Sequence, residues 1–274
     1  MEEINIKPGR TLVVGDIHGG LKALLKCLTK CKYNKEYDKL IFLGDYVDGW
    51  SESAELIDFL LDLEAQAIHK PVFLRGNHDE WCNEWMQTGI AKTIWLTQGG
   101  AATFESYMRA YDGVVPTEHA AFFYRLHNYY VDDQNRGFVH GGFHSRKGLG
   151  HEVHQSDYYW DRDLWNLVVM THGRTHESIT DSARRFEKHK EIYIGHTATT
   201  SWMCKNHYPE ADDIRQPNPG PITIPMHRCN VWNMDTGGGW SGKLSIMDID
   251  TKDYWQSDIV PDLYPEEKGR KGIK

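Results

Sequence analysis

The stretch Leu74-Arg75-Gly76-Asn77-His78-Asp79 decides how this chain is interpreted. It continues an apolar run, Pro71-Val72-Phe73-Leu74, which stops abruptly at an arginine, a glycine, an amide, an imidazole and a carboxylate. Such a run predicts a buried strand that ends in a polar loop, the place where open α/β sheets carry their chemistry. Alone, the stretch also fits an ordinary strand exit, so its meaning depends on whether the pattern recurs.

The same pattern occurs twice earlier in the chain. Thr11-Leu12-Val13-Val14 ends in Gly15-Asp16-Ile17-His18-Gly19-Gly20, and Leu40-Ile41-Phe42-Leu43 ends in Gly44-Asp45-Tyr46-Val47-Asp48-Gly49. Leucines at helical spacing follow each of these two loops. Three successive β-α units predict a parallel sheet, and right-handed crossovers place the three polar loops at one edge of it.

The rest of the chain predicts a second sheet within the same domain. We expect a helix over residues 101–110 and strands over 137–139, 192–194, 231–234 and 243–249, and the last strands fit the hairpin pattern of that second sheet. We predict one α/β domain over residues 1–260, with irregular, lid-like insertions at about 143–180 and 200–228. The second insertion is rich in proline. The charged tail, residues 261–274, is expected to fray.

Composition excludes several classes of protein. The 274 residues carry a formal charge of −8, with 39 acidic against 31 basic residues, which argues against a nucleic-acid polymer as partner. No apolar segment approaches the about 20 residues that span a bilayer, and no signal peptide is recognisable, so we expect no membrane and a cytoplasmic location. Five cysteines without a C-x-x-C pair are typical of free thiols.

Five predicted strand ends carry side chains that bind metals: Asp16, His18, Asp45, Asn77, His140 and His196. Two divalent cations in one site need a bridging carboxylate, and Asp45 is the natural bridge because it follows the middle unit of the three. This mixture of oxygen and imidazole ligands suits manganese, with iron or zinc as alternatives. Two such ions, about 3.5–4 Å apart, polarise a phosphoryl group and lower the pKa of a bridging water.

At this point the chain resembles a known family. The segments 15–19, 44–48 and 75–79 are similar to the GDxHG, GDxVDRG and RGNH(E/D) signatures of phosphoprotein-phosphatase-type metallophosphoesterases in the calcineurin-like superfamily. Within that superfamily, the chain most resembles the short bacterial and phage-type Ser/Thr protein phosphatases. His140 and His196 match two later metal histidines, and Asp235-Thr236-Gly237 resembles a closing strand. The resemblance covers about residues 10–250 and implies two facing mixed sheets flanked by helices, with a dimetal site at the strand ends.

The resemblance also implies a role for each residue. One metal would be held by Asp16, His18 and Asp45, and the other by Asp45, Asn77, His140 and His196. His78 matches the general acid that protonates the leaving group, and Asp48 matches the carboxylate that orients it. Arg75 and Arg162 match phosphate-binding arginines.

One position departs from the family pattern. Gly49-Trp50 stands where the pattern has Arg-Gly. Loss of one charged hydrogen bond to an anion costs about 1.5–3 kcal/mol, so we expect weaker phosphate binding unless another cation substitutes. Arg162, Arg146 and Lys147 are the candidates for that substitution.

The implied function is hydrolysis of a phosphate ester by attack of a metal-bridging hydroxide, without a covalent intermediate. The expected substrate is a phosphorylated protein, as for a Ser/Thr or dual-specificity phosphatase, with small phosphomonoesters as surrogates. The alternatives are a symmetrical bis(5′-nucleosyl)-tetraphosphate hydrolase and a phosphodiesterase. A non-catalytic, metal-dependent binding module is a further alternative, against which the presence of both His78 and Asp48 argues.

Two further groups of residues are weaker candidates for function. We interpret the histidines of the variable middle as exposed loop residues and not as a third metal site: His144, His151, His154, His172 and His176. Trp81 and Trp85 follow His78 at helical spacing and are expected to form core or pocket wall, in preference to a stacking platform for a base.

Overall fold

The computed structural model describes residues 8–171, 183–201 and 221–271. The two predicted insertions fall partly outside these ranges, as do His172 and His176. The division into one domain over 1–260 with a separate tail stays a prediction.

The first sheet contains the three predicted β-α units. It consists of β1 (Arg10–Val14), β2 (Asp38–Phe42), β3 (Val72–Phe73), β9 (Ser245–Asp248) and β10 (Tyr254–Gln256), in the order β10-β9-β1-β2-β3. Strands β1, β2 and β3 are parallel, as predicted, and β9 is antiparallel to β1 and to β10. The helices of the three units are α1 (Leu21–Lys30), α2 (Ser53–Gln66) and α3 (Asn77–Thr88).

The second sheet has five strands as well. They are β4 (Tyr129–Val131), β5 (Arg136–Val139), β6 (Glu191–Ile194), β7 (Met226–Arg228) and β8 (Val231–Asn233), in the order β4-β5-β6-β8-β7. Strands β5, β6 and β8 are parallel, while β4 and β7 are antiparallel edge strands. The predicted fold class, α/β with two mixed sheets flanked by helices, is confirmed.

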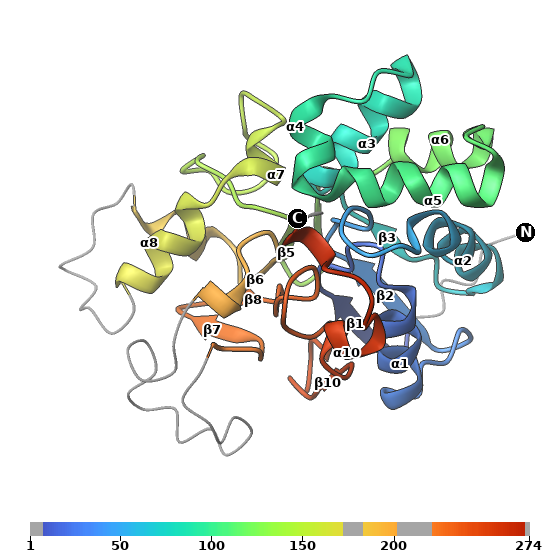
Figure 1. The fold of residues 1–274 in the computed structure, drawn as a ribbon. Coiled ribbons are helices and arrows are strands. Elements are labelled where there is room, and N and C mark those ends of the chain that lie inside the picture. Colours follow the sequence, from blue (N-terminus) through green and yellow to red (C-terminus); the bar gives the residue numbers. More distant parts are fainter. Residues whose placement is uncertain (1–7, 172–182, 202–220, 272–274) are drawn as a thin grey trace, which may run out of the picture.

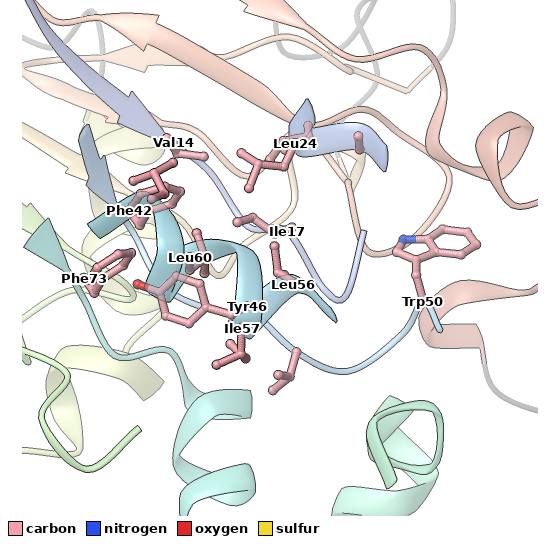
Figure 2. Close-up of a cluster of buried hydrophobic side chains, with 14 of the residues drawn as sticks. Val14, Ile17, Leu24, Phe42, Tyr46, Trp50, Leu56, Ile57, Leu60 and Phe73 are labelled. Atoms are coloured by element: carbon pink, nitrogen blue, oxygen red, sulfur yellow. The ribbon is translucent and has the colours of Figure 1, made fainter. Parts of the chain in front are cut away.

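The two sheets face each other across one buried layer. Val13, Ile41 and Met247 of the first sheet lie in the same apolar cluster as Phe138 and Tyr193 of the second. The outer face of the first sheet packs against α1 and α2 (Figure 2). Side chains of α3 and aromatic side chains of the segment that follows it complete the same core. The outer face of the second packs against α7 (Asp157–Trp160) and α8 (Asp163–Thr171) (Figure 1).

The remaining described elements are helical, and several of them border the polar loops. They are α4 (Thr93–Trp95), η1 (Leu96–Gly100), α5 (Ala101–Tyr111), α6 (Thr117–Tyr124), η3 (Ala183–Lys188), η4 (Thr199–Ser201), α10 (Val260–Leu263) and η5 (Gly269–Lys271). The helix predicted over 101–110 is therefore confirmed as α5.

Two expectations about the C-terminal part are wrong. The strand predicted over 243–249 belongs to the first sheet, between β1 and β10, because an alternating apolar pattern does not determine which sheet receives a strand. Residues 260–271, here called the C-terminal segment, do not fray. Tyr264 is 2% exposed and packs in the core of the first sheet, which outweighs the high charge of the residues around it.

Candidate active site

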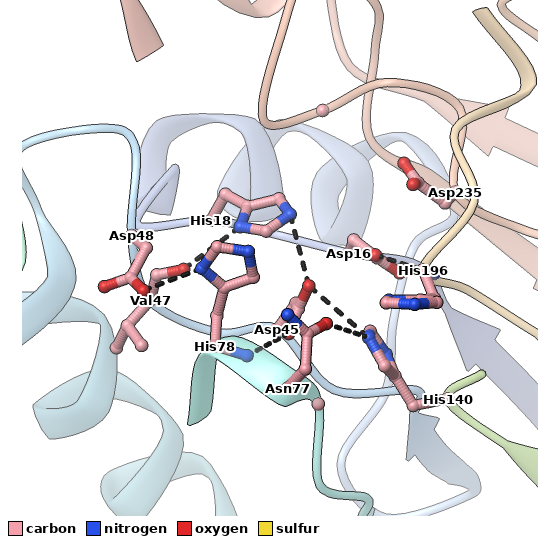
Figure 3. Close-up of polar contacts among 12 residues, drawn as sticks. Asp16, His18, Asp45, Val47, Asp48, Asn77, His78, His140, His196 and Asp235 are labelled. Carbon is pink, nitrogen blue, oxygen red and sulfur yellow. Dashed lines mark hydrogen bonds and ion pairs between the residues drawn. The ribbon is translucent and has the colours of Figure 1, made fainter. Parts of the chain in front are cut away.

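The three polar loops after β1, β2 and β3 meet at one edge of the first sheet and are bonded to each other (Figure 3). The backbone N–H of His18 donates to the carbonyl oxygen of Asp45 at 2.9 Å. The buried carboxylate of Asp79 accepts from the backbone N–H groups of Asp45, Tyr46 and Gly76 at 2.7, 2.9 and 2.8 Å. Asp79 therefore fixes the second and third loops relative to each other.

The six side chains predicted to bind metal lie together at this edge, each at most 4% exposed: Asp16, His18, Asp45, Asn77, His140 and His196. Two groups have donor atoms within 4.8 Å of one another, namely Asp16, His18 and Asp45, and Asp45, His140 and His196. Asp45 belongs to both groups, the place predicted for a bridging ligand. Its Oδ2 lies 3.5 Å from His18 Nε2 and 3.4 Å from His140 Nε2.

Asn77 joins the second group through its side-chain oxygen. Asn77 Oδ1 lies 3.3 Å from His140 Nε2. Asn77 is the first residue of α3, so the backbone that follows the third loop presents it. The structure thus brings together all the residues of the predicted ligand set, and their role as ligands stays a prediction.

The donor atoms of this cluster suit divalent cations. His18 Nδ1 lies 3.1 Å from the carbonyl oxygen of Val47 and His140 Nδ1 lies 2.9 Å from that of Leu43, so each ring donates from Nδ1 and has Nε2 left for a metal. Asp16 Oδ1 and His196 Nε2 are buried and have no hydrogen-bond partner among the described residues. Buried polar atoms are rarely left unpaired, and a metal would satisfy both. The residues therefore fit two divalent cations.

The electrostatics of the cluster also favour a bound cation. Burial raises the pKa of Asp16 well above its ordinary value, and the nearby carboxylate of Asp235 raises it further. Burial also raises the pKa of Asp45, but His140 and His78 outweigh this effect, and the net pKa lies well below the ordinary value. The pKa of His140 is raised to about 9, because Asp45 outweighs burial. Buried carboxylates crowded in this way are stabilised by positive charge.

Several of these residues have strained backbones. His18, Asp45, Asp48 and His196 adopt φ values of 53°, 54°, 73° and 67°. Residues other than glycine seldom adopt the left-handed region, and such conformations gather at functional sites. Strain of this kind is expected where a loop holds its side chains in a fixed direction, here toward the cluster.

His78 and Asp48 form a buried pair beside the cluster. His78 Nδ1 lies 2.7 Å from Asp48 Oδ2, and the two side chains are 1% and 0% exposed. Burial lowers the pKa of His78 to about 3 and raises that of Asp48 to about 8, while hydrogen bonds from Thr103 and Trp95 act against the rise. The pair holds the imidazole with Nδ1 toward Asp48 and leaves Nε2 as the ring nitrogen available for proton transfer.

Sequence reasoning missed the residues that hold Asp48. Trp95 Nε1 donates to Asp48 Oδ2 at 2.7 Å, and the Thr103 hydroxyl donates to Oδ1 at 2.7 Å. Both come from the α4–α5 segment, which lies some 50 positions along the chain from Asp48 and carries no motif. Asp235 was also missed as a site residue, although it stands in the segment that resembles a closing strand. Its position after a predicted strand was the available signal.

The two predicted phosphate arginines are engaged with the protein. Arg75 forms an ion pair with Glu80 and donates to the carbonyl oxygens of Phe123 and Tyr124, each at 3.1 Å. Arg162 Nη1 donates to the carbonyl oxygen of His196 at 2.8 Å, which places its guanidinium beside the cluster. Of the two, Arg162 is the one bonded directly to a predicted metal-ligand residue.

Aromatic side chains line the approach to the cluster. The ring of Trp81 meets that of His78 edge-on at 5.2 Å, and Trp160, which is 41% exposed, meets Trp81 at 5.0 Å. Trp85 is 5% exposed and packs in the core of the first sheet. The expectation of a core position is therefore confirmed for Trp85, while Trp81 is partly buried and packs against the same core.

Two other features lie outside this cluster. His144, Asp161 and Asp163 form a third group with the spacing of metal ligands, but His144 and Asp163 are exposed. His151 and His154 are exposed as well, in agreement with the interpretation as loop histidines. A cavity of about 620 Å³ is lined by residues of η1, α5, the C-terminal segment and the loop that contains Gly49, and by none of the six predicted ligands.

The family model for calcineurin-like phosphoesterases matches residues 9–209. Among curated relatives, serine/threonine-protein phosphatase 1 of Salmonella typhimurium is 32% identical over 88 residues, which are 32% of this chain and 38% of that phosphatase. The asymmetrical bis(5′-nucleosyl)-tetraphosphatase PrpE of Bacillus cereus is 24% identical over 248 residues, which are 85% of this chain and 87% of that enzyme.

A solved structure has the same fold. It is a protein serine/threonine phosphatase from Saccharomyces cerevisiae, with a TM-score of 0.60 at 15% identity, and the match covers 97% of this chain and 85% of that one. None of the described helices is long and apolar enough to cross a membrane.

Proposed function

Because this chain belongs to the calcineurin-like phosphoesterase family, we propose that it removes phosphate from phosphorylated proteins, as a Ser/Thr or dual-specificity phosphatase does. It is a metal-dependent phosphoester hydrolase with relatives named as phosphatases. The observation that carries the proposal is the convergence of two overlapping ligand groups on Asp45, next to the buried pair of His78 and Asp48.

Two divalent cations, manganese by preference, would be held by the two groups of side chains. Asp16, His18 and Asp45 would hold one, and Asp45, Asn77, His140 and His196 the other. Bound there, the cations would polarise the phosphoryl group of the substrate and lower the pKa of a bound water.

The protein's own residues complete the chemistry. His78 would deliver the proton on its Nε2 to the departing alkoxide, and the hydrogen bond between Nδ1 and Asp48 Oδ2 fixes the ring. Trp95 and Thr103 hold Asp48 in turn. Arg162 would bind phosphate oxygens with the guanidinium N–H groups that do not donate to His196.

A dinucleoside polyphosphate is the second candidate substrate. Two observations favour it: the relative that is matched over 85% of this chain is named an asymmetrical tetraphosphatase, and Trp81 and Trp160 offer ring surfaces beside the cluster. The sequence predicts a symmetrical hydrolase as the alternative, and the products distinguish the two modes of cleavage. Symmetrical cleavage of diadenosine tetraphosphate yields ADP alone, whereas asymmetrical cleavage yields AMP and ATP.

We also propose a cytoplasmic location. The described cysteines, Cys27, Cys31, Cys82 and Cys229, are free thiols, which supports a reducing compartment.

The experiment is metal reconstitution. The protein is stripped with a chelator, loaded with manganese, and assayed with a phosphoserine peptide, diadenosine tetraphosphate and bis(p-nitrophenyl) phosphate. We expect turnover that depends on manganese and is highest on the phosphopeptide. Preferred turnover of diadenosine tetraphosphate would replace the first candidate substrate by the second, and no turnover of any substrate with two ions bound would refute the proposed enzymatic function.

A further inference from the structure

The C-terminal segment is fastened to the loop that follows Asp48. The ring of Tyr264 stacks on that of Trp50 with centroids 5.1 Å apart, and the Trp50 indole N–H donates to the carbonyl oxygen of Gly238 at 2.8 Å. The Tyr264 hydroxyl accepts from the backbone N–H of Lys22 at 3.0 Å and donates to Glu52. Trp50 is thus the anchor of this segment, and it occupies one of the two positions where the chain departs from the family pattern.

A second contact fixes the segment close to Arg270. Glu267 accepts from both the backbone N–H and the hydroxyl of Ser51, at 2.9 and 2.7 Å. The backbone N–H of Arg270 then donates to the carbonyl oxygen of Gly239 at 2.9 Å. The backbone of Arg270 therefore has a defined place between the loop at Gly49 and the loop at Gly239.

The side chain of Arg270 fills the space that two glycines leave open. A Cβ at Gly49 would lie 3.0 Å from Arg270 Cγ, and a Cβ at Gly239 would lie 2.8 Å from Arg270 Cδ and 2.3 Å from His18 Cδ2. The stem of Arg270 consequently passes alongside the ring of His18, one of the predicted metal ligands. Gly49, the second departure from the family pattern, is what makes room for it.

The guanidinium of Arg270 meets an aromatic ring but no described carboxylate. Its guanidinium carbon lies 4.8 Å from the centre of the Trp240 ring, its Nε is buried without a hydrogen-bond partner, and no described carboxylate pairs with it. The charge nevertheless reaches the cluster. The stem of Arg270 lies beside the ring of His18 and so brings this charge to the edge of the predicted ligand cluster.

We propose that Arg270 is a phosphate-binding residue of this active site, supplied by the C-terminal segment where the family pattern has an arginine after Asp48. The inference rests on the proposed function. A guanidinium presents a planar fork of donors that matches two phosphate oxygens. Of the three candidates named from the sequence, Arg162 donates to His196 and Thr197, while Arg146 and Lys147 are exposed. Arg75, the other predicted phosphate arginine, is paired with Glu80. Arg270 would favour a phosphomonoester dianion over a diester monoanion.

The test compares Arg270→Gln with Arg125→Gln, which removes an exposed arginine paired with Glu64. We expect Arg270→Gln to weaken the binding of inorganic phosphate to the manganese-loaded protein about 10-fold or more, and to raise KM for p-nitrophenyl phosphate similarly. Metal content is expected to stay unchanged, and bis(p-nitrophenyl) phosphate should be affected less. Arg125→Gln should match the unchanged protein. Phosphate affinity of Arg270→Gln within twofold of the unchanged protein would overturn the inference.

A second measurement does not depend on whether the Gln variant folds. In the unchanged protein loaded with diamagnetic zinc, the Nε–H resonance of Arg270 is identified by its loss in Arg270→Lys. It is expected to shift as inorganic phosphate is titrated and to saturate with binding. A resonance that stays in place while phosphate binds would overturn the inference.

The two proposals fail in different ways. If the unchanged, metal-loaded protein hydrolyses no phosphoester, the proposed function fails, while the phosphate-binding comparison still tests Arg270. If the unchanged protein turns over and Arg270→Gln keeps its affinity for phosphate, the assignment of Arg270 alone fails.

Discussion

Asp79 shows how one buried carboxylate organises the site without touching a substrate. It is 0% exposed and accepts hydrogen bonds from three backbone N–H groups in two of the motif loops. A carboxylate offers acceptors only, so it can satisfy all three donors. An asparagine at this position would replace one of the two acceptor oxygens by an NH₂ group, which donates.

We therefore expect Asp79→Asn to lower the free energy of unfolding by about 1–3 kcal/mol, because it leaves at least one buried N–H without an acceptor. Chemical denaturation measures this difference. Asp62→Asn, an exposed position on α2, is the control and should stay within about 0.5 kcal/mol of the unchanged protein. Equal stability of the two variants would contradict the role given to Asp79.

His78 supports a prediction about leaving groups. Its side chain belongs to neither ligand group, and its contact with Asp45 runs through the backbone N–H at 3.0 Å. His78→Asn should keep both metals and lose about 10²–10⁴-fold in turnover of alkyl phosphates, with a smaller loss for p-nitrophenyl phosphate, whose leaving group needs no proton. Metal analysis and paired assays measure this. A variant that loses its metals would show that the role of His78 is wrongly assigned.

The residues that could be predicted from sequence are those that follow a strand directly. Asp16, Asp45 and Asn77 each follow an apolar run by a few positions, so the change in pattern marks them. Trp95, Thr103 and Arg270 reach the site from distant, irregular segments, where no local pattern indicates their direction. Gly49-Trp50 gave a partial indication of Arg270, because the missing motif arginine suggests that another residue of the chain occupies its place.

Helices and strands with a clear hydrophobic periodicity could be predicted from the sequence. Strands whose extent or sheet depends on a partner that is distant in the sequence could not. Strand β3 has two residues although the apolar run has four, because Leu74 pairs instead with His127 in an isolated bridge. Strand β9 joins the first sheet because β1 and β10 are its partners, from both ends of the described chain. Strand pairing of this kind depends on tertiary contacts.

His189 joins the irregular segment before α7 to the second sheet and supports a prediction about pH. The backbone N–H of Leu149 donates to its Nε2 at 3.0 Å, and its Nδ1 bonds Asn135 Oδ1 at 3.0 Å, so the ring is held neutral. Burial lowers the pKa of His189, and the bond to Asn135 only partly opposes this effect.

The folded protein thus takes up this proton at lower pH than the unfolded chain does. The contribution of His189 to the free energy of unfolding is complete above pH about 6.5 and declines as the pH falls below it, by up to about 1.4 kcal/mol per unit. His189→Gln should make the loss of stability between pH 7 and 5 less steep, as measured by urea denaturation at several pH values. An unchanged slope would contradict the prediction.

In the whole molecule, metal binding and folding stability are linked. The site gathers Asp16, Asp45 and Asp235 in buried positions from both sheets, and a bound cation offsets their mutual repulsion. Manganese at about 100 times its dissociation constant should raise the free energy of unfolding by about 2.7 kcal/mol per site. Thermal unfolding with and without a chelator measures this. Identical midpoints in the two conditions would mean that the sheets hold the site together without metal.

We predict that two cations occupy the two groups of side chains that share Asp45. Anomalous diffraction from crystals of the manganese-loaded protein tests it most directly. We predict two peaks, one within bonding distance of Asp16, His18 and Asp45, and the other within bonding distance of Asp45, Asn77, His140 and His196. A single peak, or a peak at His144, Asp161 and Asp163 in place of these two, would contradict the claim.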